Sequence, residues 1–389
     1  MSVVAPQGFV ANGVASGIKS GGELDLALVA TADGHPVSAA GVFTQNLVVA
    51  APVVVSRRHL AATRGRAAAV VLNSGNANAA TGKQGDDDAE RMCRAVADEL
   101  GCGPDAVLVC STGLIGYPLP MPALLAGVPP LVAGRGGDPA HGIAAAQAIM
   151  TTDTRRKETV VRGSGFVVGG MAKGAAMLAP NMATMLAVLT TDAHADPDTL
   201  QRILRHGVAD SFNAVTVDGC TSTNDTVLIL ANGRAGVVDE DELAGAVADA
   251  CLDLATQMVG DAEGHTKVVR VRVTGAASAE EAARAARQVA ESQLVKCSWY
   301  GEDPYWGRVA SELGTAGVAL DVGALTIAYG GTVVSRGCEP VDHDATAVAE
   351  HMAGEYLELH CDLGVGDGEA RVLTNDLTYG YIDENKGTS

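Results

Sequence analysis

A threonine near the middle of the chain, Thr184, stands where a nucleophilic hydroxyl group would be placed. The dipeptide Pro180-Asn181 ahead of it is a turn signal, and a short apolar run of strand length follows it. Thr184 is therefore expected at the edge between a loop and a strand. A threonine hydroxyl is a weak nucleophile that needs a base beside it. Its own free α-amine, which titrates at about pH 8, could serve as that base.

This α-amine is free only if Thr184 is the first residue of a chain, so the peptide bond from Ala183 to Thr184 must first be cut. The small Ala183 and the neighbouring turn suit attack of the Thr184 hydroxyl on the preceding carbonyl, followed by hydrolysis of the ester. The local pattern taken alone favours a plainer alternative, in which a strand simply begins with threonine.

The segment from Lys173 to Met185 resembles the self-cleavage segment of the ornithine acetyltransferases, the bifunctional glutamate N-acetyltransferases of cyclic arginine biosynthesis. A single motif is weak support, but further motifs resemble those of this family and occur in the family's order over nearly the whole chain. They are Gly41-Val-Phe-Thr44, Asn73-Ser-Gly-Asn-Ala-Asn78, Ser111-Thr-Gly-Leu-Ile-Gly116, Met150-Thr-Thr-Asp-Thr154, Phe212-Asn-Ala-Val215, Asp261-Ala-Glu-Gly264 and Asp303-Pro-Tyr-Trp-Gly-Arg308.

The resemblance implies an α/β (α+β) fold, arranged as a four-layer αββα sandwich in two lobes, of the self-processing N-terminal-nucleophile type. It implies a precursor that cleaves itself into an α chain, 1–183, and a β chain, 184–389, which assemble as an α2β2 heterotetramer. The implied reaction moves the acetyl group of N2-acetyl-L-ornithine to L-glutamate through an acetyl-threonine intermediate, without a cofactor or a metal. The sequence leaves open whether acetyl-CoA is also a donor and whether the enzyme serves arginine biosynthesis or a specialised pathway.

Acyl transfer passes through a tetrahedral oxyanion, which needs hydrogen-bond donors. Ser111-Thr112-Gly113 follows a strand with a buried pattern, and a glycine there lets backbone amides come close to a ligand. The resemblance assigns the oxyanion role to Thr112 and Gly113. The alternative from the residues alone is a plain turn at the end of a strand.

Two charged residues suit the ends of an amino-acid substrate. Lys173 lies eleven residues before Thr184, far enough to fold back on it across a turn and hold a carboxylate. Glu263, in a loop, suits the cationic end or amino group of ornithine. Taken alone, a solvated surface lysine and an exposed acid are the simpler interpretations.

Thr151 and Thr152 carry hydroxyl groups that suit the same substrate, although Asp153 makes a helix cap an equal interpretation. By resemblance, Asn385 and the terminal Ser389 also contact substrate, but this tail is one residue shorter than the family pattern. A second departure is Tyr305, where the family has asparagine, so we assign Tyr305 no catalytic role.

Composition excludes other classes of protein. The chain has 27 basic and 46 acidic side chains, a net charge of −19, which argues against binding nucleic acid or anionic membrane. Eight cysteines without a C-x-x-C pair, and no basic segment ahead of an apolar stretch at the start, predict reduced thiols in the cytoplasm. The nine histidines show no zinc-ligand spacing.

The elements that must position these residues are short apolar strands that alternate with helices. Asp196-Pro197 predicts the start of one helix, and Ser278 with Glu281 is a capping box that opens another, running towards Val295. The glycine-rich run 163–170 predicts a hairpin. Strand-like runs occur at 26–30, 68–72, 107–110, 165–169, 185–189, 227–230, 268–273 and 325–329.

Two rival functions remain. The nearer is a threonine-nucleophile amidase or hydrolase of N-acyl amino acids, in which water takes the acyl group; release of acetate without glutamate would favour it. The more distant is an uncleaved protein that binds an amino acid in the same pocket without chemistry.

Overall fold

The computed structural model describes residues 2–177 and 185–387, and these form two compact units. Unit 1 comprises Met1–Asn213 and Thr221–Met258, and unit 2 comprises Ala214–Cys220 and Val259–Ser389. The predictions for Ala183, Thr184 and Ser389 fall outside the described residues. No helix within the described ranges combines the length and apolar character that crossing a bilayer requires.

Unit 1 contains two sheets. The first has four strands in the order β1-β2-β5-β6, with β5 and β6 parallel and the other neighbours antiparallel: β1 Phe9–Val14, β2 Leu26–Thr31, β5 Ala69–Asn76 and β6 Val107–Leu114. The second has six strands in the order β4-β3-β10-β9-β8-β7: β4 Arg66–Ala67, β3 Val37–Phe43, β10 Thr226–Val237, β9 Leu186–His194, β8 Val167–Lys173 and β7 Lys157–Arg162.

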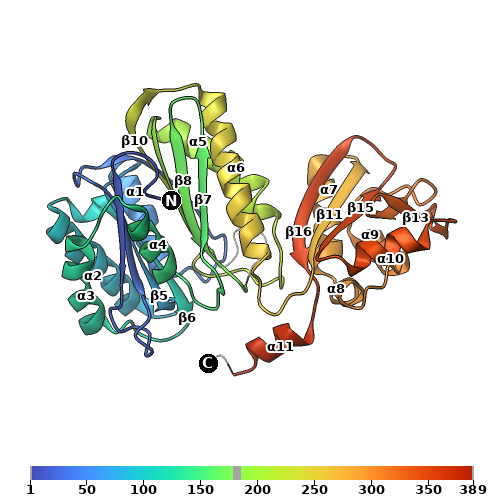
Figure 1. Cartoon of the computed structure of the whole chain (residues 1–389), viewed down its shortest axis with the longest axis horizontal. Coiled ribbons are helices and arrows are strands. Elements are labelled where there is room, and N and C mark those ends of the chain that lie inside the picture. The colour runs from blue at the N-terminus through green and yellow to red at the C-terminus, as the bar shows by residue number, and fades with distance from the viewer. Residues whose placement is uncertain (1, 178–184, 388–389) are drawn as a thin grey trace. The chain divides into compact units, whose positions relative to one another are not determined.

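The two sheets of unit 1 pack face to face between layers of helices (Figure 1). Leu72 and Leu108 of the first sheet share a buried core with Val188 and Leu228 of the second. The outer face of the first sheet is covered by α1 Ala51–Ala62, α2 Gly82–Leu100 and α3 Met121–Ala133. The outer face of the second is covered by α5 Pro197–Ala209 and α6 Glu240–Val259. This confirms the predicted αββα layers within unit 1.

A further helix of unit 1, α4 Pro139–Ala148, contributes small side chains to the core between the sheets. Gly13 of β1 shows how close this packing is, because a Cβ atom there would lie 2.2 Å from the carbonyl oxygen of Ala144. The predicted glycine-rich hairpin is confirmed, since β7 and β8 pair antiparallel around residues 163–166.

Unit 2 is a six-stranded sheet with helices. The strand order is β14-β13-β12-β15-β11-β16: β14 Glu339–Pro340, β13 Thr332–Arg336, β12 Thr326–Tyr329, β15 Tyr356–Asp362, β11 Val268–Ala276 and β16 Gly368–Asn375. Its helices are α7 Ala279–Glu291, α8 Gln293–Tyr300, α9 Trp306–Thr315, α10 Ala345–Ala353 and α11 Tyr379–Asn385. The core contains Val271 and Leu359 from the sheet and Val289, Trp299 and Leu313 from helices.

The helix starts follow the capping residues. The Asp196 side chain accepts hydrogen bonds from the amides of residues 198 and 199 at the start of α5, and Ser278 accepts one from the Glu281 amide at the start of α7. The predicted run towards Val295 is wrong, because α7 ends at Glu291 and Ser292 caps a new helix, α8.

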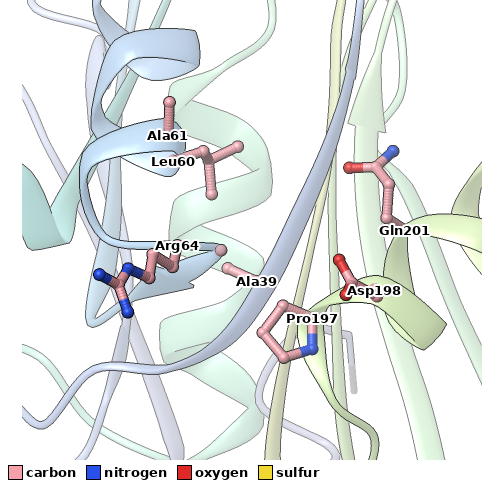
Figure 2. Close-up of a pocket in the computed structure, with 8 residues that line it drawn as sticks. Ala39, Leu60, Ala61, Arg64, Pro197, Asp198 and Gln201 are labelled. Atoms are coloured by element: carbon pink, nitrogen blue, oxygen red, sulfur yellow. The ribbon is translucent and has the colours of Figure 1, made fainter.

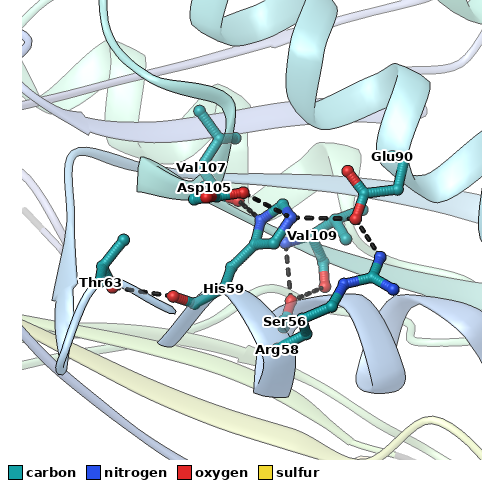
Figure 3. A network of polar contacts seen from close by, with 8 residues as sticks. All are labelled: Ser56, Arg58, His59, Thr63, Glu90, Asp105, Val107 and Val109. Carbon is teal, nitrogen blue, oxygen red and sulfur yellow. Dashed lines mark hydrogen bonds and ion pairs between the residues drawn. The ribbon is translucent and has the colours of Figure 1, made fainter. Parts of the chain in front are cut away.

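Strand β6 lies at an edge of its sheet, and side chains of α1 hydrogen-bond to backbone groups along that edge (Figure 3). The Ser56 hydroxyl donates to the Val109 carbonyl at 2.7 Å and accepts from the Val109 amide at 2.8 Å, as a neighbouring strand would. His59 Nδ1 lies 2.8 Å from the Val107 carbonyl, and its Nε2 lies 3.1 Å from Glu90 Oε1 of α2. These contacts hold β6 in place just ahead of Thr112-Gly113.

Candidate active site

The structure brings two of the predicted site residues of unit 1 together. Lys173, the last residue of β8, places its Nζ 3.2 Å from the Thr112 Oγ1 of β6. Both side chains are buried, at 3% and 1% exposed, so the interpretation of Lys173 as a solvated surface lysine is wrong. An ammonium group has donors only, so Thr112 accepts this hydrogen bond and its own hydroxyl proton is left to donate.

Gly113 follows directly and has a backbone that requires glycine. Its φ is +133°, and a Cβ atom there would lie 2.3 Å from the carbonyl carbon of Gly75 on β5. Gly113 is exposed although Thr112 is buried, so the end of β6 is the point at which this backbone reaches the surface of unit 1.

Buried amide side chains fix the end of β6 from both sides. The Ser111 hydroxyl donates to Asn73 Oδ1 of β5 at 2.6 Å. Asn224, just ahead of β10, donates from Nδ2 to the carbonyls of Ser111 at 2.9 Å and Ala77 at 2.6 Å. The two sheets of unit 1 are thus joined by hydrogen bonds at the residue before Thr112.

Asp153 holds the threonine loop against the end of β8. Its carboxylate accepts from the Lys157 Nζ at 2.5 Å, the Gly174 amide at 2.7 Å and the Thr151 amide at 2.9 Å. Burial acts to raise the pKa of Asp153, but the charges of Lys173 and Lys157 and these hydrogen bonds outweigh burial and lower the pKa to about 2. Asp153 is therefore ionised, and it places negative charge beside Lys173.

The loop that Asp153 holds also carries the two predicted substrate threonines. Thr151 is half-buried and Thr152 is exposed. Residues 150–156 form no helix, so the interpretation of Asp153 as a helix cap is wrong. The loop instead lies next to Lys173, because Asp153 binds the Thr151 and Gly174 amides at once.

A second buried carboxyl group, that of Asp225, lies directly ahead of β10 and faces the start of β9. Its Oδ1 accepts from the Met185 amide at 3.0 Å. Burial raises the pKa of Asp225 well above its ordinary value, although the Met185 hydrogen bond and the charge of Lys173 act to lower it. Met185 is the first described residue after the predicted nucleophile.

In unit 2, the structure brings Glu263 and Asn385 together. Glu263 Oε2 accepts from Asn385 Nδ2 at 2.7 Å, and the same amide donates to the Tyr381 carbonyl within α11 at 2.9 Å. The helix is tied down by the Thr378 hydroxyl, which donates to the Gly264 carbonyl and accepts from the Tyr381 amide. Glu263 is only 8% exposed, so the simple interpretation as an exposed acid is wrong.

Glu263 lines a cavity of about 170 Å³ within unit 2. Three further acids, Asp218, Glu291 and Asp376, line it together with the buried Lys296. Burial lowers the pKa of Lys296 to about 8, despite the opposing effect of these acids. A cavity with this surplus of carboxyl groups suits a cationic group.

Cavity size alone does not indicate the site. A cavity of about 440 Å³ in unit 1 lies between the end of α1 and the start of α5, where Leu60 and Arg64 face Pro197, Asp198 and Gln201 (Figure 2). None of the predicted site residues lines it.

Among the described residues there is no group of three or more histidine, cysteine, aspartate or glutamate side chains that could hold a metal ion.

Sequence reasoning assigned no role to Lys157 and Asp225 and a different one to Asp153. Lys157 opens a strand with alternating character, and Asp225 comes directly before a buried apolar run. A charged residue next to or within a strand-like run is the only feature of the local sequence that could have indicated a buried, paired side chain at either position.

Comparison with known proteins gives a consistent result. The family model described as "ArgJ family" matches residues 10–387. The chain is 46% identical over 390 residues to the arginine biosynthesis bifunctional protein ArgJ of Thermobifida fusca, with all of both chains covered. It is 47% identical over 400 residues to the protein of that name from Mycolicibacterium paratuberculosis, covering 100% of this chain and 96% of that one.

Solved structures of similar proteins include two at higher sequence identity. Arginine biosynthesis bifunctional protein ArgJ from Bacillus halodurans is 35% identical, with a TM-score of 0.49, and the match covers 51% of this chain and 96% of that chain. Ornithine acetyltransferase from Mycobacterium tuberculosis, complexed with ornithine, is 47% identical, with a TM-score of 0.42, and the match covers 46% and 94%.

Proposed function

This chain belongs to the ArgJ family, and from that premise we propose that it is an acetyltransferase that moves the acetyl group of N2-acetyl-L-ornithine to L-glutamate. The support is identity of 46% to 47% over 96% to 100% of the length of relatives named arginine biosynthesis bifunctional proteins. The products are L-ornithine and N-acetyl-L-glutamate. Both substrate and product are N-acetyl amino acids, so the exchange is nearly thermoneutral and recycles the acetyl group.

In the proposed mechanism, Thr184 is the nucleophile and its α-amine the base. The Thr184 hydroxyl oxygen attacks the acetyl carbon, the amide C–N bond breaks, and the proton taken by the α-amine passes to the ornithine nitrogen. The amino group of glutamate then attacks the acetyl-threonine ester and restores the hydroxyl. This ping-pong path requires cleavage between Ala183 and Thr184, which gives an α chain, 1–183, and a β chain, 184–389.

The observation that carries this proposal is the buried contact between Lys173 and Thr112. Lys173 binds the acceptor side of the Thr112 hydroxyl, which turns its proton towards any other acceptor and adds positive charge close by. Such an arrangement stabilises an oxyanion, for which Thr112 and the Gly113 backbone are proposed as donors. Removing one such donor typically slows a reaction by about 100- to 1000-fold.

The substrate-binding residues are proposed in both units. In unit 1 they are Thr151, Thr152 and Lys173, which the Asp153 carboxylate holds close to one another. In unit 2 they are Glu263 and Asn385, which hydrogen-bond to each other, and Ser389 of the tail. Lys173 suits the substrate carboxylate, and the acidic surroundings of Glu263 suit the ammonium group of ornithine.

We further propose an α2β2 assembly, a cytoplasmic location and action without a cofactor or metal. The first follows from the predicted self-cleavage and the resemblance. The second is supported by eight free cysteine thiols, four of them buried, which suit a reducing compartment. The use of acetyl-CoA as a second donor is proposed from the word bifunctional in the relatives' names.

Intact-mass analysis under denaturing conditions, combined with an ornithine-release assay, tests the proposal. We expect two fragments from the wild-type protein, the second beginning at Thr184, and ornithine release that depends on glutamate. Thr184→Ala should give one inactive chain, and Thr184→Ser should cleave at least partly. Thr190→Ser, a conservative change of a threonine on β9, is the matched control and should cleave normally.

Other outcomes separate the rival functions. Release of acetate from N-acetylornithine without glutamate would show an amidase. A single full-length mass for the wild-type protein, without ornithine release, would show a protein that binds its ligand without chemistry. Normal turnover by Thr184→Ala would contradict the mechanism itself.

A further inference from the structure

The carboxyl group of Asp225 holds the residue that follows the proposed nucleophile. Asp225 is 0% exposed, and its Oδ1 accepts the hydrogen bond of the Met185 amide at 3.0 Å. The Met185 carbonyl accepts from the Thr226 amide at 3.1 Å. Both backbone polar groups of Met185 are therefore bound by two consecutive residues at the start of β10.

This anchor is itself fixed. The Asp225 carbonyl accepts from the Thr44 amide at 2.9 Å. The preceding residue, Asn224, binds the carbonyls of Ser111 and Ala77 through its side chain. The same short segment thus holds Met185 on one side and the backbone next to Thr112 on the other, so it sets both relative to each other.

The charge state of Asp225 follows from its surroundings. Burial raises the pKa of this carboxyl well above its ordinary value, and the cation that acts against burial is Lys173 of β8, which is shared with Asp153. Among the described residues, Asp225 Oδ2 has no partner with hydrogen-bond geometry, and the nearby Ser222 and Thr44 hydroxyls lower the pKa of this carboxyl less than burial raises it. A buried carboxylate with one oxygen unpaired is strongly disfavoured, so these surroundings favour the neutral acid.

Neutrality has a chemical use at this position. A peptide unit is planar, so holding the Met185 amide restricts the peptide unit that Met185 shares with Thr184. The proposed base, the Thr184 α-amine, works only when unprotonated. A carboxylate close to that amine would raise the amine pKa and keep it protonated, whereas a neutral carboxyl would not.

We propose, on the basis of the function proposed above, that Asp225 is a positioning residue for Thr184. It binds the Met185 amide as a neutral carboxyl group, and thereby orients the nucleophile for self-cleavage and acyl transfer without adding negative charge beside the base.

The test compares two substitutions with different consequences. Asp225→Asn keeps a neutral acceptor for the Met185 amide, so self-cleavage and kcat should stay within about 3-fold of the wild type. Asp225→Ala removes the acceptor, and kcat and the cleavage rate should fall about 10- to 100-fold with KM little changed, because misplacement of a reacting group lowers the rate of chemistry. The rates come from intact mass and ornithine release, and melting temperature checks folding.

Asp192 provides the matched control. It lies in the same strand, β9, and its carboxylate accepts from the Val167 amide at 2.8 Å and the Gln7 amide at 3.1 Å. Asp192→Asn and Asp192→Ala should lower the melting temperature without changing the cleavage rate. A loss of cleavage in these variants equal to that of Asp225→Ala would show a general effect of stability and overturn the proposal.

The pH dependence of kcat/KM gives a second measurement. The acidic limb, which reports the Thr184 α-amine, should be unchanged in Asp225→Asn. A shift of that limb to lower pH in this variant would show that Asp225 is ionised, and wild-type rates in Asp225→Ala would show that it has no positioning role; either result overturns the inference. If the alanine variant does not fold, the asparagine variant decides alone. An uncleaved, inactive wild-type protein would instead contradict the proposed function.

Discussion

Two aspartates of unit 1, Asp153 and Asp225, are both buried and both close to Lys173, yet Asp153 is expected to be ionised and Asp225 neutral. Asp153 is 7% exposed and its pKa is lowered to about 2. Asp225 is 0% exposed and its pKa is raised well above the ordinary value. Burial therefore does not determine the charge of a carboxyl group by itself.

The difference comes from the number and type of partners. Asp153 accepts from the Lys157 ammonium and from two backbone amides, and Lys173 acts on it as well. Asp225 accepts from the Met185 amide, and this bond, the Ser222 and Thr44 hydroxyls and the charge of Lys173 together do not offset burial. Pairs of titratable groups whose pKa values are moved apart are typical of catalytic sites. Here the ionised Asp153 binds the Lys157 ammonium group, and the neutral Asp225 binds the Met185 amide directly ahead of β9.

The largest expected effect comes from replacing each of the two aspartates by asparagine, which tests whether their charge states differ. Asp153→Asn removes the charge that pairs with the fully buried Lys157, and it should lower the free energy of unfolding by about 3 to 5 kcal/mol. Asp225→Asn replaces one neutral group by another and should lower it by about 1 kcal/mol or less. Urea unfolding followed by far-ultraviolet circular dichroism, in an uncleaved Thr184→Ala background, measures both.

Tryptophan fluorescence provides an internal control for that experiment. Both tryptophans, Trp299 and Trp306, lie in unit 2, so their signal reports the unfolding of unit 2. The fluorescence transition should move less than the circular dichroism transition in Asp153→Asn. Equal losses of stability in Asp153→Asn and Asp225→Asn would mean that the two carboxyl groups share one charge state.

Core strands of the fold could be predicted from the sequence where they are continuous apolar runs or alternate apolar with charged residues. Residues 227–230 and 268–273 lie in β10 and β11 as expected. Two of the strands that were missed, β7 Lys157–Arg162 and β16 Gly368–Asn375, lie at sheet edges and carry charged side chains. An edge strand has neighbours on one side only, so its sequence need not be apolar.

The site residues could be predicted only where they lie in motifs that resemble those of the family. Thr112, Lys173 and Glu263 were identified by resemblance, and the structure adds that all three are buried. For Asp153, a helix cap was an equal alternative to the substrate-binding interpretation of Thr151 and Thr152. Its main partner across the fold is Lys173, twenty residues away, and Asp225 binds an amide forty residues away. Contacts at such separations depend on strand pairing, which local pattern does not specify.

A smaller effect sharpens the comparison through pH. The folded-state pKa of Asp153, about 2, is below its ordinary value of 3.8, so its contribution to stability is fully present above about pH 4 and is lost as pH falls towards 2. This contribution is about 2.5 kcal/mol at 1.36 kcal/mol per pKa unit. The difference in unfolding free energy between the parent and Asp153→Asn should shrink by most of that amount as pH falls from about 5 to 2.

Asp225 should show the opposite sign. Its pKa is higher in the folded state than in the unfolded state, so the parent should lose stability relative to Asp225→Asn as pH rises above about 3.8. Unfolding curves from pH 2 to 7 for the three proteins measure both trends. Parallel curves for all three would mean that neither carboxyl group has a perturbed pKa.

The smallest expected effect separates the two lysines that act on Asp153. Lys157→Met keeps an unbranched apolar stem and removes only the ammonium group, while Lys173 and the Thr151 and Gly174 amides still stabilise the carboxylate. Stability should fall by about 1 to 2 kcal/mol, less than for Asp153→Asn, because the remaining groups keep Asp153 charged.

The matched control for Lys157→Met is Lys83→Met, which breaks a pair with the same spacing of four residues on the surface of α2. The Lys83 Nζ lies 2.9 Å from Asp87 Oδ2, with the side chains 85% and 55% exposed. An exposed pair of this kind contributes little to stability, so Lys83→Met should leave the unfolding curve nearly unchanged. If Lys157→Met instead destabilised unit 1 as much as Asp153→Asn, Lys157 would be the essential partner of the carboxylate. Lys173 would then contribute little to keeping Asp153 charged.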